Sequence, residues 1–319
     1  MKRIIVVGAN WLATAFAEAA TSLGFSVLGI APRSRPENWP AAAEHKELNA
    51  GKDAKMAMLA FAPEILVHMG ADLSPRGSWR GSRRQAVQLF SQAVDLGVPR
   101  IICWSSVRYY GPVPGRTLPL RELDPPIAAR RGRLGAAAAD LEAGLEPIRE
   151  KGSAEVVVLR AAPLPLVSDD PLARLLVGRI VPRVAGFDPP LQFLHPNDAV
   201  GVLLHAVSGA LPGTYNVAGD GVMLYSEVCR ATGRPTLPLV PSLWKSLLAI
   251  GVPVGLPRVP EGTVEEICHS LVVDNSRLKT HFGYRPGHDS RQALARLLHE
   301  RQLSRGTPTL VKGSRTRFR

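Results

Sequence analysis

Short apolar runs and helix-periodic stretches alternate along the first half of the chain. The runs that predict buried strands are residues 4–7, 25–30, 64–68, 100–104 and 154–159. Between the first two runs, Leu12, Phe16 and Ala20 recur at helical spacing until Gly24, and residues 85–96 and 134–145 are further helical stretches. Strands separated by such helices indicate an α/β protein with a doubly wound, Rossmann-like parallel sheet. Its ligand should bind at the carboxyl edge of the strands.

The pattern changes after about residue 160. Prolines become frequent, the apolar runs shorten, and helices are predicted at residues 197–207, 226–232 and 290–302. We therefore expect a Rossmann-like dinucleotide-binding domain over residues 1–160. A smaller C-terminal α+β lobe, interleaved with the sheet, is expected over residues 161–304. Residues 305–319 are basic, contain no acidic side chain and are expected to be disordered.

Composition narrows the class of protein. The 319 residues are 45% hydrophobic, enough for a full core, and no apolar run is long enough to cross a bilayer. The cysteines Cys103, Cys229 and Cys268 are scattered and odd in number, which argues against a disulfide framework or a metal site. With no signal-peptide pattern at the start, we expect a cytoplasmic protein. The net charge of +12 favours an acidic partner, or else marks a basic surface without a specific partner.

Six motifs follow one another in an order that is typical of one family. They are VHMGA (67–71), WSSVRYYG (104–111), LRAAP (159–163), FLHPNDA (193–199), GTYNVAG (213–219) and VVDNSRLKTHFGYRP (272–286). On these motifs the chain resembles the extended short-chain dehydrogenases/reductases of the NAD-dependent epimerase/dehydratase type, from Ile4 to Leu303. The resemblance implies a Rossmann-like fold and an NAD(P) site at the carboxyl edge of the sheet.

The first glycine turn departs from the family's pattern. The family spaces three glycines GxxGxxG, whereas this chain matches the tighter GxGxxG spacing with Gly8, Asn10 and Ala13 at the three positions. The second position calls for a left-handed backbone, which Asn tolerates better than other residues with a side chain, and Ala13 is small enough for helix–strand packing. Together with Trp11 and Leu12, the turn is a candidate phosphate cradle at a helix N-terminus. The alternative is that only the fold persists.

The remaining cofactor residues are predicted from the same comparison. Arg33 and Arg35 follow the second strand where an NAD-binding protein has an acid, so they favour NADP over NAD; the alternative is two exposed surface arginines. The resemblance adds His68, Gly70 and Ser105 at the ends of the next two strands. His68 is also interpretable as a core residue.

The catalytic pair that the resemblance implies is missing. The family uses Ser or Thr with a Tyr and, four residues later, a Lys. Ser106 matches the serine, but Arg131 and Gly135 fall at the Tyr and Lys positions, and no Tyr or Lys occurs between residues 111 and 150. Arginine cannot act as a general acid near neutral pH. Tyr109 and Tyr110 could supply a phenol, although Tyr110 matches the family's structural tyrosine.

Other residues predict binding more than catalysis. The arginines that should approach the carboxyl edge are Arg76, Arg80, Arg83, Arg84, Arg130, Arg131 and Arg133. They could hold an anion, or they could be solvated helix starts. Residues 241–260 group apolar side chains beside Lys245, which predicts either a packed helix or a membrane-surface segment. His195 and Asp198 are expected to hydrogen-bond the lobe to the sheet, and no metal site is expected.

Three functions remain from the sequence. The leading hypothesis is a degenerate epimerase/dehydratase-like protein that binds NAD(P), with NADP favoured, or another nucleotide or anionic ligand, without Tyr–Lys catalysis. The second is an NADP-dependent oxidoreductase or epimerase with an unconventional proton donor. The third is a nucleic-acid-binding or complex-scaffolding subunit. Partners allowed for are an anionic small molecule, nucleic acid, an acidic protein and a second copy of the chain.

Overall fold

The structure of this chain is a computed structural model. It describes residues 2–32, 34–70, 79–127, 132–165, 170–240, 243 and 262–306. Within these ranges, side chains are described except at residues 79–82, 133–134 and 301–306.

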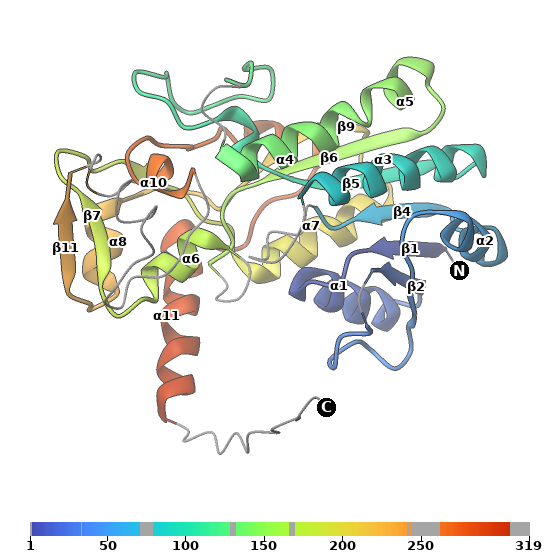
Figure 1. The fold of residues 1–319 in the computed structure, drawn as a ribbon, viewed down its shortest axis with the longest axis horizontal. Coiled ribbons are helices and arrows are strands. Elements are labelled where there is room, and N and C mark those ends of the chain that lie inside the picture. The colour runs from blue at the N-terminus through green and yellow to red at the C-terminus, as the bar shows by residue number, and fades with distance from the viewer. Residues whose placement is uncertain are drawn as a thin grey trace, which may run out of the picture.

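A seven-stranded sheet forms the centre of the molecule (Figure 1). Its strands are β1 (Arg3–Val7), β2 (Ser26–Ala31), β3 (Glu44–Glu47), β4 (Ile65–His68), β5 (Arg100–Ser106), β6 (Glu155–Ala161) and β9 (Gly213–Val217). They are ordered β3-β2-β1-β4-β5-β6-β9, and every neighbouring pair is parallel. The order runs outward in both directions from β1, so the doubly wound, Rossmann-like α/β fold is confirmed.

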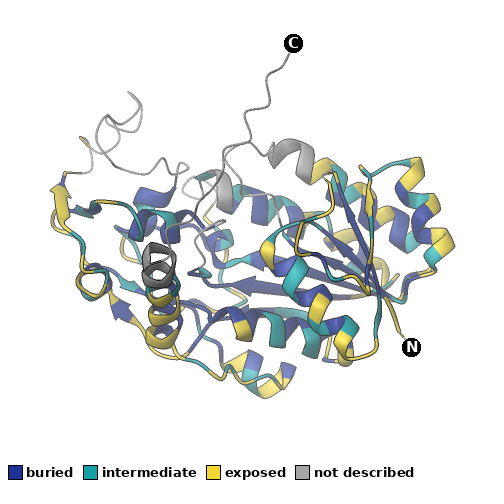
Figure 2. Cartoon of the chain, turned by 90° about the horizontal axis from the view of Figure 1, so that it is seen from below, coloured by how far each residue is buried: buried dark blue, intermediate teal, exposed yellow. Residues whose placement is uncertain are grey.

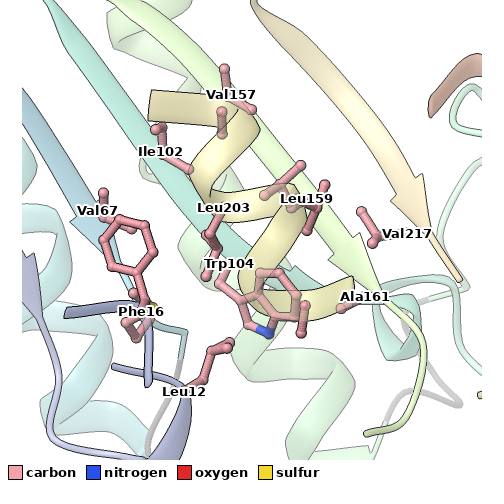
Figure 3. Close-up of a cluster of buried hydrophobic side chains, with 14 of the residues drawn as sticks. Leu12, Phe16, Val67, Ile102, Trp104, Val157, Leu159, Ala161, Leu203 and Val217 are labelled. Carbon is pink, nitrogen blue, oxygen red and sulfur yellow. The ribbon is translucent and has the colours of Figure 1, made fainter. Parts of the chain in front are cut away.

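Helices cover both faces of this sheet. One face carries α1 (Trp11–Ser22) and α7 (Pro196–Ser208), and the other carries α2 (Lys52–Phe61), α3 (Trp79–Asp95), α4 (Gly132–Ala143) and α5 (Glu146–Lys151). Figure 3 shows the first face, where Phe16 of α1 and Leu203 of α7 join one buried cluster with Ile102 and Leu159 of the strands. Alternate side chains along a strand point to opposite faces, so each strand feeds both layers. The central strands β1, β4, β5 and β6 are consequently largely buried, while the edge strand β3 and the outer helix faces are exposed (Figure 2).

The described residues of the connection from β2 to β3 (32 and 34–43) form no helix, and Trp39 covers the strands there. Trp39 is buried in the same cluster as Phe16. Its indole N–H donates to the Ala43 carbonyl at 3.2 Å, and its ring stands edge-on to His45 at 5.1 Å. A Cβ built on Gly29 would lie 2.5 Å from the Trp39 ring. The ring therefore lies directly on the β2 backbone, where only glycine leaves room.

The C-terminal lobe has its own buried cluster. Its elements are α6 (Pro171–Leu176), β7 (Val181–Val184), β8 (Pro190–Leu191), β10 (Met223–Leu224), α8 (Tyr225–Ala231), β11 (Thr236–Leu239), α10 (Thr263–Glu266) and α11 (Ser290–Gly306). β8 pairs antiparallel with β10, and β7 pairs parallel with β11. Among the described residues, no helix is both long and apolar enough to cross a membrane. In Figure 1, α11 projects away from the body of the lobe.

The structure corrects several predicted boundaries. The five predicted strands are present, with ends shifted by at most two residues, but β3 and α2 lie in a stretch for which the sequence predicted no element. The last helix continues to Gly306, so the prediction of disorder from residue 305 is wrong for its first two residues. Residues 307–319, and residues 241–260 apart from Leu243, lie outside the described residues.

Candidate functional site

The predicted phosphate cradle lies where the strand order reverses, between β1 and β4. Gly8 follows β1 with a φ of +129°, and a Cβ there would lie 3.1 Å from the Cβ of Met69. The Met69 amide donates to the Val7 carbonyl at 2.9 Å. This is the place where a doubly wound sheet usually binds its ligand. The close approach of the two loops explains why residue 8 is glycine.

Asn10 does not have the left-handed backbone that the sequence predicted. Its φ of −86° and ψ of 175° are extended, and it is the N-cap of α1. Its Oδ1 accepts the Ala13 amide at 2.9 Å, and its Nδ2 donates to the Met69 carbonyl at 3.1 Å. An N-cap residue normally has an extended backbone, so the asparagine is selected here for its side chain. Gly8 alone carries the positive φ in this turn.

Two amides at the start of α1 are left for an anion. The Asn10 side chain takes the Ala13 amide, and helical geometry gives the amides of Trp11 and Leu12 no partner within the helix. Trp11 is exposed, whereas the side chains of Leu12 and Ala13 are buried under the helix. The positive end of the helix dipole acts at the same point. The turn therefore provides two donors for a phosphate, with the third donor already used.

The end of β4 forms the next part of this edge. Gly70 has a φ of +78°, and a Cβ there would lie 2.9 Å from the Trp104 carbonyl oxygen. His68 is buried against Phe90 of α3, with ring centroids 5.4 Å apart, and its Nδ1 has no hydrogen-bond partner. Burial lowers the pKa of His68 from 6.5 to about 4. The structure therefore places His68 in the core as a neutral side chain.

The two serines at the end of β5 have different surroundings. Ser105 is buried, and its Oγ donates to Oε1 of Glu142 at 2.5 Å. Ser106 is half-buried, and its Oγ accepts the Arg108 amide at 3.2 Å. Among the described residues, no acceptor bonds the Ser106 hydroxyl proton. The Ser105 hydroxyl is therefore engaged by Glu142, and direct contact of Ser105 with a cofactor stays a prediction.

Glu142 and Arg160 form a buried ion pair that the sequence did not reveal. Arg160 contacts the Glu142 carboxylate with two nitrogens, the closer at 2.7 Å, and donates to the Tyr110 hydroxyl at 2.9 Å. The Tyr110 hydroxyl in turn donates to Asn216 at 2.8 Å. Burial raises the pKa of Tyr110 to about 12 despite the nearby guanidinium. Tyr110 is thus a structural tyrosine, while Tyr109 is half-buried and stacks on Arg160.

The position at which the resemblance places the catalytic lysine carries no side chain, because residue 135 is glycine. Gly135 is buried in α4, seven residues before Glu142 and hence on the same helix face, which is directed at β5. Arg131 lies outside the described residues, as do Arg33, Arg76 and Arg130. Arg35 is exposed and donates to the carbonyls of Trp39 and Pro40, both at 3.2 Å.

His195 and Asp198 meet a third residue, His288, that the sequence did not single out. The Asp198 carboxylate accepts from the Gly287 amide at 2.8 Å, and from the amide and Nδ1 of His288 at 3.0 and 2.9 Å. The two imidazoles are stacked, with centroids 3.7 Å apart and planes 14° from parallel. Ligand atoms of the three side chains lie within 4.8 Å of one another, but nearly parallel rings direct their in-plane lone pairs side by side, which is a poor arrangement for tetrahedral ligation of one ion. The hydrogen bonds of the cluster join α7 to the loop before α11.

The described residues fit the pyrophosphate of a dinucleotide better than the ribose at its nicotinamide end. The turn at Gly8 and Asn10 offers amides to a pyrophosphate, and the Ser106 hydroxyl is free to donate. At the nicotinamide end, Gly135 provides no side chain that could hold a ribose.

Comparison of the sequence with known proteins found uncharacterised relatives. No protein-family model matches the chain. An uncharacterised protein of Mycobacterium tuberculosis is 26% identical over 235 residues, which cover 70% of this chain and 62% of that protein. A second one is 26% identical over 303 residues, which cover 92% of this chain and only 29% of that protein. The chain thus spans less than two thirds of the length of these curated relatives.

Solved structures resemble the chain along almost its whole length. UDP-glucose 4-epimerase of Thermus thermophilus, in complex with NAD, has a TM-score of 0.71 at 17% identity and covers 94% of this chain and 99% of its own. The Thermotoga maritima UDP-glucose 4-epimerase with UDP-glucose also has a TM-score of 0.71, at 17% identity, covering 95% and 99%. An NAD-dependent NDP-hexosamine 5,6-dehydratase of tunicamycin biosynthesis has 0.71 at 18%, covering 95% and 98%. The chain shares the fold of these two epimerases and of the dehydratase.

Proposed function

We propose that the protein binds a nicotinamide dinucleotide, or another nucleotide with a phosphate group, at the carboxyl edge of its sheet without Tyr–Lys catalysis. The observation that carries this proposal is a difference between two positions at the carboxyl edge of the sheet. The turn at Asn10 is held by two side-chain hydrogen bonds and offers the Trp11 and Leu12 amides, while the lysine position is Gly135. Three proteins of the same fold carry NAD or a nucleotide sugar, or depend on NAD, which supports the ligand class.

The residues have separate roles in this proposal. The Trp11 and Leu12 amides would hold the pyrophosphate at the N-terminus of α1. The Ser106 hydroxyl would donate to the ligand, since the Arg108 amide already occupies one of its lone pairs. A bound dinucleotide would supply hydride transfer, but Tyr110 cannot provide the proton because its hydroxyl is buried and its pKa is raised.

We further propose that NADP is preferred to NAD. No acid follows β2, and Arg35 is exposed there with one guanidinium nitrogen bonded to loop carbonyls. The other nitrogens remain available for a 2′-phosphate, and an arginine beside β2 is the usual way of accepting that group.

The test is native mass spectrometry of the purified protein, followed by calorimetric titration with NAD, NADP and pyrophosphate. We expect NADP to bind most tightly, and Asn10→Ala to weaken all three ligands because it loosens the turn. Asn197→Ala, which removes an exposed asparagine side chain at the start of α7, is the matched control and should leave affinity unchanged. Binding of none of the three ligands would refute the proposal, and tighter binding of NAD would refute the preference.

A second candidate is an NADP-dependent oxidoreductase or epimerase with an unconventional proton donor. It is favoured by one observation: the Ser106 hydroxyl is half-buried at the end of β5 and has no acceptor among the described residues. Turnover of nucleotide sugars and aldehydes with NADP, abolished by Ser106→Ala, would establish it and would overturn the absence of catalysis. We expect no such turnover.

A further inference from the structure

A buried ionic cluster adjoins the site on its C-terminal side. Arg108 lies two residues after Ser106, and its side chain is 3% exposed. Its guanidinium donates twice to Asp170, at 2.9 and 3.1 Å, and twice to Glu266, at 2.5 and 3.0 Å. Both carboxylates are more than nine-tenths buried. We call these three residues the Arg108 clamp.

The clamp joins elements that belong to different hydrophobic clusters. Val107 and Tyr110, on either side of Arg108, are buried in the cluster between the sheet and α1 and α7. Asp170 is the N-cap of α6, and Glu266 is in α10; both helices bury their apolar side chains in the lobe. One guanidinium therefore connects the serine-bearing end of β5 to two helices of the lobe.

The charges of the clamp do not balance by themselves. Asp170 is compensated by the Leu172 and Ala173 amides as well as by the guanidinium, whereas Glu266 has the Arg108 guanidinium as its main counter-charge. Burial raises the pKa of Glu266, and Arg108 offsets that effect only in part. Burying charged side chains costs free energy that apolar side chains of similar volume would avoid. A buried ion cluster of this kind therefore contributes little to stability by itself.

The same residue also orients the serine. The Arg108 amide donates to Ser106 Oγ, so a shift of Arg108 toward or away from the lobe moves the partner of that hydroxyl. We propose that Arg108 is a positioning residue: it fixes the lobe on the end of β5 and so sets the geometry with which Ser106 receives its ligand. The expected effect on ligand affinity rests on the proposed function, whereas the expected effect on the attachment of the lobe to β5 does not.

The variants separate a positioning role from a merely structural one. Arg108→Met leaves two buried carboxylates without their counter-charge and should lower the melting temperature sharply. The triple variant Arg108→Met, Asp170→Asn, Glu266→Gln removes all three charges and should recover most of that stability. Glu266→Gln alone keeps the shape of the cluster and serves if Arg108→Met does not fold. Arg149→Met, which removes a half-exposed arginine paired with Glu146, is the matched control.

Two measurements decide the outcome. In the triple variant we expect amide hydrogen exchange to rise together at residues 107–110, 171–176 and 263–266, and NADP affinity to fall by about tenfold, a typical size for coupling between separate elements. Wild-type exchange at these segments in the triple variant would overturn the proposal. Raised exchange with wild-type NADP affinity would also overturn it, because the clamp would then hold the lobe without positioning the ligand site. If the wild-type protein binds no dinucleotide, the proposed function fails, and the exchange measurement still judges the clamp.

Discussion

At the scale of single residues, the candidate site depends on one asparagine side chain that makes two hydrogen bonds. Asn10 caps α1 through Ala13 and ties the turn to β4 through the Met69 carbonyl. The GxGxxG spacing placed Asn10 at the right position, but sequence spacing does not specify a backbone angle. The residue was therefore given a left-handed conformation that Gly8 alone adopts in this turn.

Replacing Asn10 should separate its two contributions. Asn10→Ala removes the cap and the tether, and we expect a loss of about 1–2 kcal/mol in the free energy of unfolding. Asn10→Gly should cost less, because glycine is nearly as good as asparagine at an N-cap. Urea unfolding of the two variants measures the difference. A larger loss for Asn10→Gly than for Asn10→Ala would contradict the capping role.

His68 provides a prediction in pH. Burial lowers the pKa of the His68 imidazole to about 4, so this side chain stays neutral in the folded protein down to about pH 4. In the unfolded chain the same side chain binds a proton below about pH 6.5. Unfolding is therefore favoured as the pH falls between these two values, and the free energy of unfolding should drop by about 3 kcal/mol over that window on account of His68. His68→Leu should remove this share of the pH dependence while leaving stability near neutral pH similar. Parallel pH dependences of the two proteins in urea unfolding would show that His68 is not buried as described.

Buried polar partners were the hardest residues to predict. Glu142 lies in an alanine-rich helix, and the one available signal was an acid on the face of α4 that also carries Gly135. Its partners Ser105 and Arg160 come from two strands that are distant in sequence. Periodicity identifies a buried face, but it does not pair a carboxylate with a guanidinium across the sheet.

At the scale of elements, the apolar strands were predictable and the polar ones were not. β3 has the sequence EHKE and lies at one edge of the sheet, exposed except for His45, so it shows no buried run. The β2–β3 connection was equally hidden, because one tryptophan there covers the strands where the other crossovers use a helix. The order of the sequence motifs, by contrast, was sufficient to predict the fold. The central strands that carry these motifs are buried on both faces.

Gly29 tests this connection directly. In Gly29→Ala the new methyl would lie 2.5 Å from the Trp39 ring, so the loop must shift, and we expect a loss of about 1–3 kcal/mol. Adding Trp39→Leu should recover part of that loss relative to Trp39→Leu alone, as in a double-mutant cycle. Gly287→Ala is the control, because a Cβ there meets its nearest neighbour at an ordinary 3.6 Å. Additive losses in the cycle would show that Trp39 does not lie on Gly29.

At the scale of the whole molecule, a net charge of +12 can act through a single site or through the surface. Many of the described arginines are internally paired, including Arg100, Arg108, Arg149 and Arg160. A dinucleotide held at the α1 turn would displace few counterions, whereas a nucleic acid spread over a basic surface would displace many. The salt dependence of binding therefore distinguishes the two uses of the charge.

We expect NADP affinity to fall by less than about tenfold between about 50 and 200 mM salt, since in the proposed complex the few charges of a dinucleotide would be met by two amides and one or two arginines. A polyanion that contacts 6–10 basic side chains would lose about 10³–10⁵ over the same range. Titrating NADP and a single-stranded oligonucleotide in parallel makes the comparison, with Arg35→Ala as the variant that should lower NADP affinity and leave the oligonucleotide almost unaffected. An oligonucleotide that binds more tightly than NADP at the higher salt would assign the net positive charge to nucleic-acid recognition, and the turn at Asn10 would then have a structural role in the fold without binding a dinucleotide.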